Sequence, residues 1–315
     1  MIKKIFLKLP RSLLKIVLPA IYRILIKFKL NRRTINFLND KSYKSNNVYN
    51  FTKIIKDLLN NKKIIAMDVG AQGGFNSDNF FPDKYNTFFE DILVEPIKAE
   101  SEKLKNKKFV INKGLWSKKD KKKLYILQNR LGSSSMYEPD KDNFDIHNIK
   151  KKDFKNYDVT DTKHIECDTL NNLLSELEIR SLDYLKIDTQ GAELEILNGI
   201  GKYRPLLIKI ETHIFSLYKN VPSWHHLLNL LYELNYVVID WKEIGEHNTR
   251  VPAEMDMILI PNFNNEDGKN LIANSKEKFI SLMLIFGQLN LLKLILKRID
   301  INIKEIEKFE DLYFN

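Results

Sequence analysis

Short apolar segments alternate with helical ones along the chain from about residue 60 to residue 260. The apolar segments are rich in Ile, Leu and Val, which is typical of buried strands. They cover 64–69, 92–94, 109–112, 184–188, 206–211, 236–240 and 255–260, and 123–128 and 163–167 are candidates for extra strands. Helical periodicity covers 97–106, 169–178, 191–200 and 223–235. This alternation predicts an α/β fold with a mostly parallel sheet flanked by helices.

A glycine-rich turn follows the first predicted strand. The stretch MDVGAQGG, residues 67–74, holds three of the 11 glycines in the 315-residue chain, and Asp68 stands just before them. The spacing of Gly70, Gly73 and Gly74 differs from the G-x-G-x-x-G turn that binds a dinucleotide pyrophosphate. A tight turn alone would explain the glycines but not the acid ahead of them. We therefore expect the backbone to approach a ligand here.

Acidic residues close four of the predicted strands. Asp68, Glu95, Asp188 and Glu211 each stand at or just after the carboxyl end of an apolar run. In an open α/β sheet, ligands bind at the edge formed by the carboxyl ends of the strands. A single acid at a strand end can simply cap the next helix. Four acids on one edge indicate a binding site instead.

The order of these residues indicates the kind of ligand. Glu95, about 25 residues past the glycine turn, is placed to accept hydrogen bonds from two ribose hydroxyls, as a second-strand acid does in dinucleotide folds. Asp68 supplies a carboxylate for an amine or a sulfonium. A sugar-bearing cofactor without pyrophosphate is therefore favoured, and S-adenosylmethionine fits. Trp116, just after the third strand, is either a neighbour of the adenine or an ordinary core aromatic residue.

Four motifs, in order, resemble the FkbM family of S-adenosylmethionine-dependent methyltransferases. They are DVGAQGGFNS, the EP after the second strand, CDTLNNLL and LDYLKIDTQGAELEILNGI, and the resemblance covers about residues 60 to 260. It implies a class I methyltransferase, Rossmann-like fold, to which this chain adds N- and C-terminal helices. It also implies an O-methyltransferase that acts on a hydroxyl of a sugar, a glycan or a related small molecule.

The resemblance assigns the cofactor-binding residues one by one. Those that match the family's cofactor loop are Asp68, Gly70, Ala71 and Gly74. Gln72 and Gly73 stand where the family usually has Asn and Ile, although glutamine keeps an amide. Glu95 matches the ribose-binding acid. Together with Gln72 and Trp116, these residues are the predicted cofactor site.

Substrate-binding residues are predicted in two other places. The stretch GSSSMYEP, 132–139, resembles a serine-containing substrate-side loop of the family, which makes Ser134 and Ser135 candidates. In the second long motif, Gln190 replaces a usual glutamate and is the third candidate. The polar stretch 129–154 around the serines has little periodicity and is long enough to be a lid or a substrate loop.

Methyl transfer to a hydroxyl of high pKa usually needs a general base. The candidates are Asp188, Glu211 and His213, all predicted at the ligand edge, and ETH at 211–213 resembles a motif of the family. His213 titrates nearest to neutral pH, and the alternative is a structural histidine at a strand-to-helix turn. Glu193 is predicted to begin a helix, where an acid complements the helix dipole, so it is not assigned to catalysis.

No group of His, Cys, Asp and Glu shows the sequence spacing of a metal site, so no metal ligand is predicted. Asp188 and Glu211 together would be able to hold Mg²⁺, but nothing in the sequence requires it. The single cysteine, Cys167, excludes an intramolecular disulfide and suits a reducing compartment. A cytoplasmic location is therefore expected.

Positive charge is concentrated at the N-terminus. Residues 1–33 hold ten Lys and Arg and no acid, and the remaining 41 basic and 41 acidic residues balance. This segment also has helical apolar spacing, but its longest uncharged run, 16–22, is too short to span a bilayer. No small-residue cleavage site follows, which argues against a secretory signal. Such a helix either lies on an anionic membrane, at its inner face, or packs on its own domain or a twin subunit.

The pattern divides the chain into a basic amphipathic helical segment over 1–45, a methyltransferase domain over 46–265 and a helical extension over 266–315. In the extension, 279–292 is uncharged, which suits a buried or oligomer-forming helix better than a membrane span. A homo-oligomer is one reading of this helix.

Two other functions stay open. A nucleic-acid methyltransferase is disfavoured by the neutral main body, so a small-molecule or glycan acceptor is expected rather than a nucleic acid. A non-catalytic, membrane-associated binding module with a decayed site is disfavoured by the intact Asp68, Glu95 and Asp188.

Overall fold

The computed structural model describes residues 50–245, 248–249 and 251–307. These residues fall in two compact units. The larger unit lies within 63–77 and 88–279, and the smaller one within 50–62, 78–87 and 280–307. The three-part division predicted from the sequence stays a prediction.

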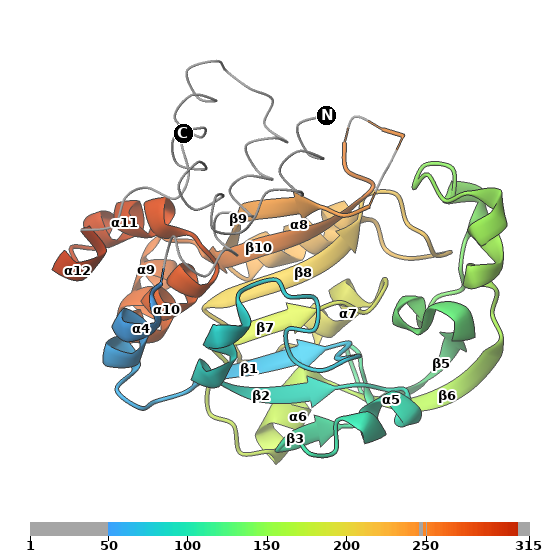
Figure 1. The fold of residues 1–315 in the computed structure, drawn as a ribbon, viewed down its shortest axis with the longest axis horizontal. Helices are drawn as coiled ribbons and strands as arrows, with labels where there is room; N and C mark the ends of the chain where they lie inside the picture. The colour runs from blue at the N-terminus through green and yellow to red at the C-terminus, as the bar shows by residue number, and fades with distance from the viewer. Residues whose placement is uncertain (1–49, 246–247, 250, 308–315) are drawn as a thin grey trace, which may run out of the picture. The chain divides into compact units, whose positions relative to one another are not determined.

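The larger unit is built on a seven-stranded sheet (Figure 1). In spatial order its strands are β3 (Phe109–Ile111), β2 (Phe89–Val94), β1 (Ile64–Val69), β7 (Tyr184–Ile187), β8 (Leu207–His213), β10 (Glu254–Pro261) and β9 (Tyr236–Glu243). The first five are parallel to one another, and β10 runs antiparallel to both β8 and β9. The predicted α/β fold is therefore confirmed, and its mostly parallel sheet is consistent with a Rossmann-like methyltransferase fold.

One face of this sheet packs against helices. The larger unit includes the helices α5 (Lys98–Lys103), α6 (Leu170–Glu176), α7 (Glu193–Asn198), α8 (Trp224–Glu233) and α9 (Glu266–Asn274). Met67, Leu185 and Ile208, from three neighbouring strands, share one apolar cluster with Leu173 of α6 and Leu227 of α8. Removal of this much apolar surface from water is the main stabilising contribution to such a layer. The strand and helix centres predicted from the sequence all lie within these elements.

The opposite face of the sheet carries charged side chains in its central strands. Asp68, Lys186 and Lys209 each follow directly after a residue of the apolar cluster, so alternation along the strand turns them to the other side. All three are at least 95% buried. Buried charges need partners. The ion pairs that these residues form are part of the candidate site described below.

A second, three-stranded sheet extends the larger unit. Its strands are β4 (Gly114–Leu115), β6 (Asp161–Asp168) and β5 (Asp120–Ile126), which confirms the two extra strands expected from the sequence. Between β5 and β6 lie the short 3-10 helices η2 (Gln128–Ser133), η3 (Lys141–Asn143) and η4 (Lys151–Tyr157). Phe144 and Tyr157 are buried there with Leu217 and Tyr218. The polar stretch 129–154 is thus a folded insertion with an apolar cluster of its own.

Strand ends differ from the sequence prediction in two places. β2 begins at Phe89, three residues before the predicted start. Its first three residues include two acids, so they lack the uniformly apolar pattern by which the strand was predicted. β8 continues to His213, so Glu211 lies inside the strand and does not close it. Because side chains alternate along a strand, Glu211 and His213 point to one face of the sheet and the buried Thr212 between them points to the other.

The smaller unit is helical in the part that the structure describes. Its elements are α4 (Thr52–Leu59), most of η1 (Asp83–Phe88), the end of α10 (Lys276–Ile285), α11 (Leu289–Arg298) and α12 (Lys304–Glu307). Phe80 and Phe81 pack against Phe286, with ring centroids 5.7 and 5.2 Å away. The uncharged stretch 279–292 is not one helix, because the chain turns at Gly287, whose φ is +71°.

The predicted amphipathic helix within 1–45 lies outside the described residues. Among the residues that the structure does describe, no helix is both long enough and apolar enough to cross a membrane.

Candidate active site

The carboxyl ends of β1, β7 and β8 meet at one edge of the large sheet, and antiparallel β10 begins at the same edge (Figure 1). Asp68 lies near the end of β1, and Asp188 follows β7. In the pairing of β8 with β10, His213 lies opposite Glu254. The three predicted catalytic residues are therefore brought to one edge, together with an acid that the sequence analysis did not single out.

The glycine-rich loop after β1 is shaped by a close approach to β7. Gly70 has φ +82°, and a Cβ built on it would lie 1.9 Å from the backbone oxygen of Asp188. Only glycine fits such a contact at positive φ. The turn therefore needs Gly70 for packing, whatever else the loop binds.

The backbone amides of this loop are largely used by the fold itself. The amides of Gly70 and Ala71 donate to the carbonyl of Val94, at 3.0 and 3.2 Å, and the amide of Gly74 donates to Ala71, at 2.9 Å. The side chain of Ala71 is buried beside Leu93. A loop with these amides occupied is a poor cradle for a pyrophosphate, which binds to free amides.

Gln72 of the same loop reaches the folded insertion. A Cβ built on Gly132 would lie 2.8 Å from Oε1 of Gln72, so the two residues are in direct contact. Gly132 belongs to η2, which immediately precedes the predicted substrate serines. The predicted cofactor loop and the predicted substrate-side loop are thus neighbours.

Asp68 forms a buried ion pair. Its Oδ1 lies 3.1 Å from Nζ of Lys186, and Oδ2 of Asp188 lies 3.7 Å from the same nitrogen. Asp68 is 1% exposed. One cation therefore joins the acid of the glycine-rich motif to the acid of the second motif. A direct contact between Asp68 and a cofactor stays a prediction.

Glu95 lies just after β2 and is 4% exposed. Its Oε1 accepts a hydrogen bond from the backbone amide of Ile97, at 2.7 Å. Burial raises the pKa of this carboxyl to about 7, against the opposing effect of the Ile97 amide. Such a desolvated carboxylate gains strongly from added hydrogen-bond donors, which two ribose hydroxyls would supply.

Trp116 and the two predicted substrate serines have partners within the protein. Trp116 lies in the main apolar cluster, with its ring centroid 6.1 Å from that of Tyr137. The hydroxyl of Ser134 accepts from the amide of Leu127, at 3.1 Å. The hydroxyl of Ser135 donates to the carbonyl of Gln190, at 2.7 Å. These contacts give all three a structural role, and their contacts with cofactor or substrate stay predictions.

Gln190 connects two of the catalytic candidates. Its Nε2 donates to Oδ1 of Asp188, at 3.0 Å, and to Oε1 of Glu211, at 2.5 Å. Its Oε1 lies 2.9 Å from the hydroxyl of Tyr218. Because the amide nitrogen has two protons, one side chain can hold both carboxylates without a like-charge contact. An ionised glutamate at this position would have no proton for either carboxylate.

The turn that holds Gln190 is fixed by Glu193, the first residue of α7. Oε1 of Glu193 accepts from the amides of Thr189 and Gly191, at 3.2 and 3.0 Å, and from the hydroxyl of Thr189, at 3.0 Å. Gln190 itself has φ +59°. The acid at the helix start therefore has a structural task.

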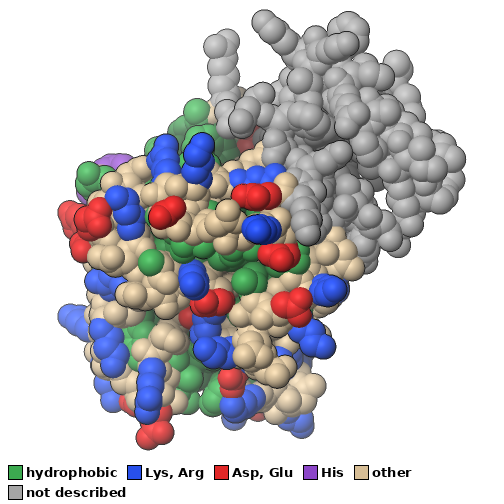
Figure 2. All heavy atoms as spheres, turned by 90° about the vertical axis from the view of Figure 1, so that its left-hand side faces the viewer, with side chains coloured by type: hydrophobic (Ala, Val, Ile, Leu, Met, Phe, Trp, Pro, Cys, Tyr) green, Lys and Arg blue, Asp and Glu red, His purple; other side chains and the backbone are tan. Residues whose placement is uncertain are grey.

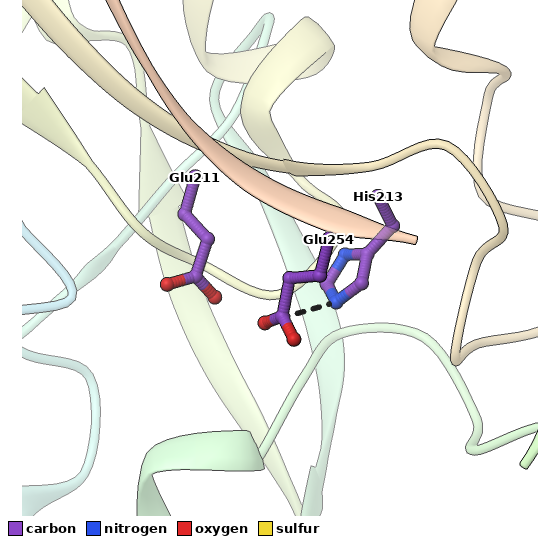
Figure 3. A group of neighbouring side chains, drawn as sticks. All are labelled: Glu211, His213 and Glu254. Atoms are coloured by element: carbon purple, nitrogen blue, oxygen red, sulfur yellow. Dashed lines mark ion pairs between the residues drawn. The ribbon is translucent and has the colours of Figure 1, made fainter. Parts of the chain in front are cut away.

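Glu211, His213 and Glu254 form a compact group (Figure 3). One donor atom from each lies within 4.8 Å of those of the other two. Nε2 of His213 lies 3.4 Å from Oε1 of Glu254, which is ion-pair distance, but it is not aligned for a hydrogen bond. His213 is 8% exposed.

The pKa values of the group reflect burial and crowded charge. Burial, then the charges of Asp188 and Glu254, raise the pKa of Glu211 well above its ordinary value. Burial acts to lower the pKa of His213, but Glu254 beside it raises it overall. Burial acts to raise the pKa of Glu254, but His213 lowers it to about 2. Negative charge on Glu254 is thus stabilised at the expense of Glu211.

Glu254 and its strand neighbour Asp256 were missed from the sequence. Asp256 pairs with Lys209, at 2.7 Å between Oδ1 and Nζ. The alternation in AEMDMILI places both acids on one face of a strand, and this signal was available. What the sequence does not show is that β10 inserts antiparallel beside β8 and turns this face toward His213.

The comparison with protein families agrees with this geometry. The family model described as "Methyltransferase FkbM domain" matches residues 68–238, which is just over half of the chain and runs from Asp68 of the glycine-rich turn into β9. The chain therefore belongs to the FkbM methyltransferase family, and the resemblance found in its motifs is confirmed. No curated protein matches the chain.

Proposed function

We propose that the chain transfers a methyl group from S-adenosylmethionine to a hydroxyl of a sugar, a glycan or a related small molecule. The observation that supports this best is the division of the sheet edge into two halves. The glycine-rich loop and Glu95 follow β1 and β2, whereas Asp188, Glu211 and His213 lie at the ends of β7 and β8. A donor side and a proton-accepting side thus stand next to each other.

Within this division, the donor would lie over the β1 and β2 ends. Glu95 would accept hydrogen bonds from its ribose. Gly70 has no side chain, which would leave room for the cofactor beside the backbone of the loop. When bound, S-adenosylmethionine supplies an activated methyl group whose C–S bond electrons remain on sulfur as the methyl leaves.

The acceptor would lie beside Asp188. The acceptor oxygen forms the new O–C bond, and its proton passes to a carboxylate oxygen of Asp188. Asp188 suits this task because its side chain is 25% exposed and its backbone abuts the donor loop at Gly70. Gln190 and Lys186 hold the two carboxylate oxygens from either side, at 3.0 and 3.7 Å. A general base of this kind contributes typically 10²- to 10⁴-fold to a rate.

The nucleic-acid alternative gains no support from the charges on the face of the molecule that Figure 2 draws. On the face drawn in Figure 2, Lys and Arg side chains are interspersed with Asp and Glu, and neither sign gathers into a broad patch. A protein that binds phosphate backbones concentrates positive charge on one face.

The experiment is a methyl-transfer assay with labelled S-adenosylmethionine and a panel of hydroxyl-bearing sugars, glycans and oligonucleotides. We expect label on a sugar hydroxyl, with mass spectrometry giving the O-methyl position. Asp188→Asn should lower turnover about 100-fold or more. The matched control Asp161→Asn, a half-exposed acid in β6, should leave turnover unchanged. Label on oligonucleotides alone would contradict the proposal.

A further inference from the structure

The group of Glu211, His213 and Glu254 has the composition of a metal site. Two carboxylates and one imidazole come from paired residues of β8 and β10, and their donor atoms already lie within 4.8 Å of one another. Mixed oxygen and nitrogen donors of this kind bind divalent ions of the first transition row, such as Mn²⁺ and Zn²⁺.

A second observation points into the same space. Nε2 of His213 is buried and makes no hydrogen bond to the residues that the structure describes. The ring is 8% exposed, and its nearest charged neighbour in the group is Glu254, at 3.4 Å. A buried polar atom without a hydrogen bond is costly, and a metal ion would use its lone pair.

The surrounding charges also favour a cation. Asp188 and Asp256 both act on Glu211 through their negative charge. Of the nearby lysines, Lys209 is paired with Asp256, at 2.7 Å, and Lys186 with Asp68, at 3.1 Å. The carboxylate of Glu211 accepts a hydrogen bond from the neutral amide of Gln190, and that of Glu254 lies beside the imidazole of His213. A shared proton between these two carboxyls is the competing account.

We propose that Glu211, His213 and Glu254 bind one divalent transition-metal ion, and that this ion holds two neighbouring oxygens of the acceptor, as in a vicinal diol of a sugar. The second half rests on the proposed function. Three protein ligands leave coordination positions open for a substrate, and a bound ion lowers the pKa of a coordinated hydroxyl.

The geometry requires a small contraction. Ligand atoms about 2.1 Å from an ion in octahedral positions are about 3 Å apart. The donors of His213 and Glu254 are already 3.4 Å apart, and no pair in the group is separated by more than 4.8 Å. Glutamate has enough rotatable bonds for this, and β8 and β10 hold the backbones in register. Gln190 occupies Oε1 of Glu211, which orients the carboxylate while its other oxygen serves the ion.

The test is a Mn²⁺ titration of the chelator-treated full chain, followed by electron paramagnetic resonance. We expect one bound Mn²⁺ per chain, weakened at least tenfold in Glu254→Gln and in His213→Ala. The control Glu166→Gln, which makes the same change at a glutamate that is 67% exposed, should bind as the parent does. Absence of saturable binding, or equal binding in all variants, would overturn the proposal.

A readout on the parent chain covers the case in which a variant does not fold. Electron spin echo envelope modulation of bound Mn²⁺ should show coupling to an imidazole nitrogen, and saturable binding without it would refute the site. Binding of S-adenosylhomocysteine in chelator separates the two proposals. A chain that binds S-adenosylhomocysteine but no Mn²⁺ keeps the proposed function and loses the metal site, whereas one that binds neither loses both.

For the acceptor, the nuclear magnetic resonance signals of a methylated sugar with a neighbouring hydroxyl should broaden when Mn²⁺ is bound to the protein. The analogue without that hydroxyl should broaden much less. Equal broadening of the two would overturn the diol assignment.

Discussion

Nζ of Lys186 lies 3.1 Å from Oδ1 of Asp68, and this buried ion pair joins the glycine-rich motif at the end of β1 to the long motif around β7. The residues are 118 positions apart in the chain and directly paired between β1 and β7. Lys186 is 5% exposed and Asp68 is 1% exposed. The pair therefore sets the relation between the glycine-rich loop after β1 and the Asp188 turn after β7.

The first prediction concerns that pair. Lys186→Met should lower the free energy of unfolding by about 3 to 5 kcal/mol, because it leaves a buried carboxylate without this cation. The double variant Lys186→Met/Asp68→Asn should lose less than the sum of the single changes. Chemical denaturation measures both. Lys121→Met, at a lysine that is 61% exposed, should change stability by less than about 1 kcal/mol. Strict additivity would refute the pairing.

The second prediction concerns Gly70. Gly70→Ala should destabilise the protein by more than about 3 kcal/mol, since the new Cβ would meet the Asp188 carbonyl at 1.9 Å. Gly245→Ala is the matched control, because Gly245 also has positive φ, +67°, but no described residue lies within 4 Å of the added atom. It should show only the backbone strain, about 1 to 2 kcal/mol. Equal losses, measured by thermal unfolding, would show that the close approach does not matter.

The third prediction concerns Gln190. Gln190→Glu should destabilise the protein by about 1 to 3 kcal/mol at neutral pH, because a donor shared by two carboxylates becomes a third carboxylate. Gln190→Asn keeps an amide and tolerates the φ of +59°, so it should cost less. Denaturant midpoints give the order of the three proteins. A glutamate variant as stable as the parent would contradict the bridging role.

The fourth prediction is a pH dependence from Glu95. The folded-state pKa, about 7, lies above the ordinary value of 4.5 because of burial. The fold favours the neutral carboxyl. The contribution of Glu95 to the free energy of unfolding is therefore fully present below about pH 4.5 and is lost as pH rises through 7. The loss approaches about 3 kcal/mol. Glu95→Gln removes this pH-dependent loss of stability, so the variant should become more stable relative to the parent as pH rises from 5 to 8. Parallel pH profiles of the two proteins would contradict this.

The sequence was sufficient for the parts of the site that depend on local order. Gly70 and Asp68 stand next to a strand whose apolar pattern is plain, and Asp188 closes another. It was insufficient where partners come from distant strands. Glu254 acquires a role only through the antiparallel register of β10 with β8. The ion pair of Lys209 with Asp256 likewise depends on the register of β10 beside β8.

Residue type alone was also insufficient to separate ligand contacts from internal ones. Ser135 was selected as a substrate residue because its loop resembles that of the family, and the structure gives its hydroxyl a buried partner at Gln190. Such a bond between two loops depends on their approach in three dimensions. No pattern within either loop encodes it.

The central claim, that the sheet edge binds S-adenosylmethionine through Glu95, is tested most directly by calorimetric titration of the full chain with S-adenosylhomocysteine at pH 8. The account predicts one site per chain. It also predicts affinity at least tenfold lower in Glu95→Gln, which loses a charged acceptor for the ribose hydroxyls. Glu90→Gln, the same change at a glutamate within the preceding strand β2, should bind within about twofold of the parent. Absence of binding to the parent chain, or equal affinity in all three proteins, would contradict the claim.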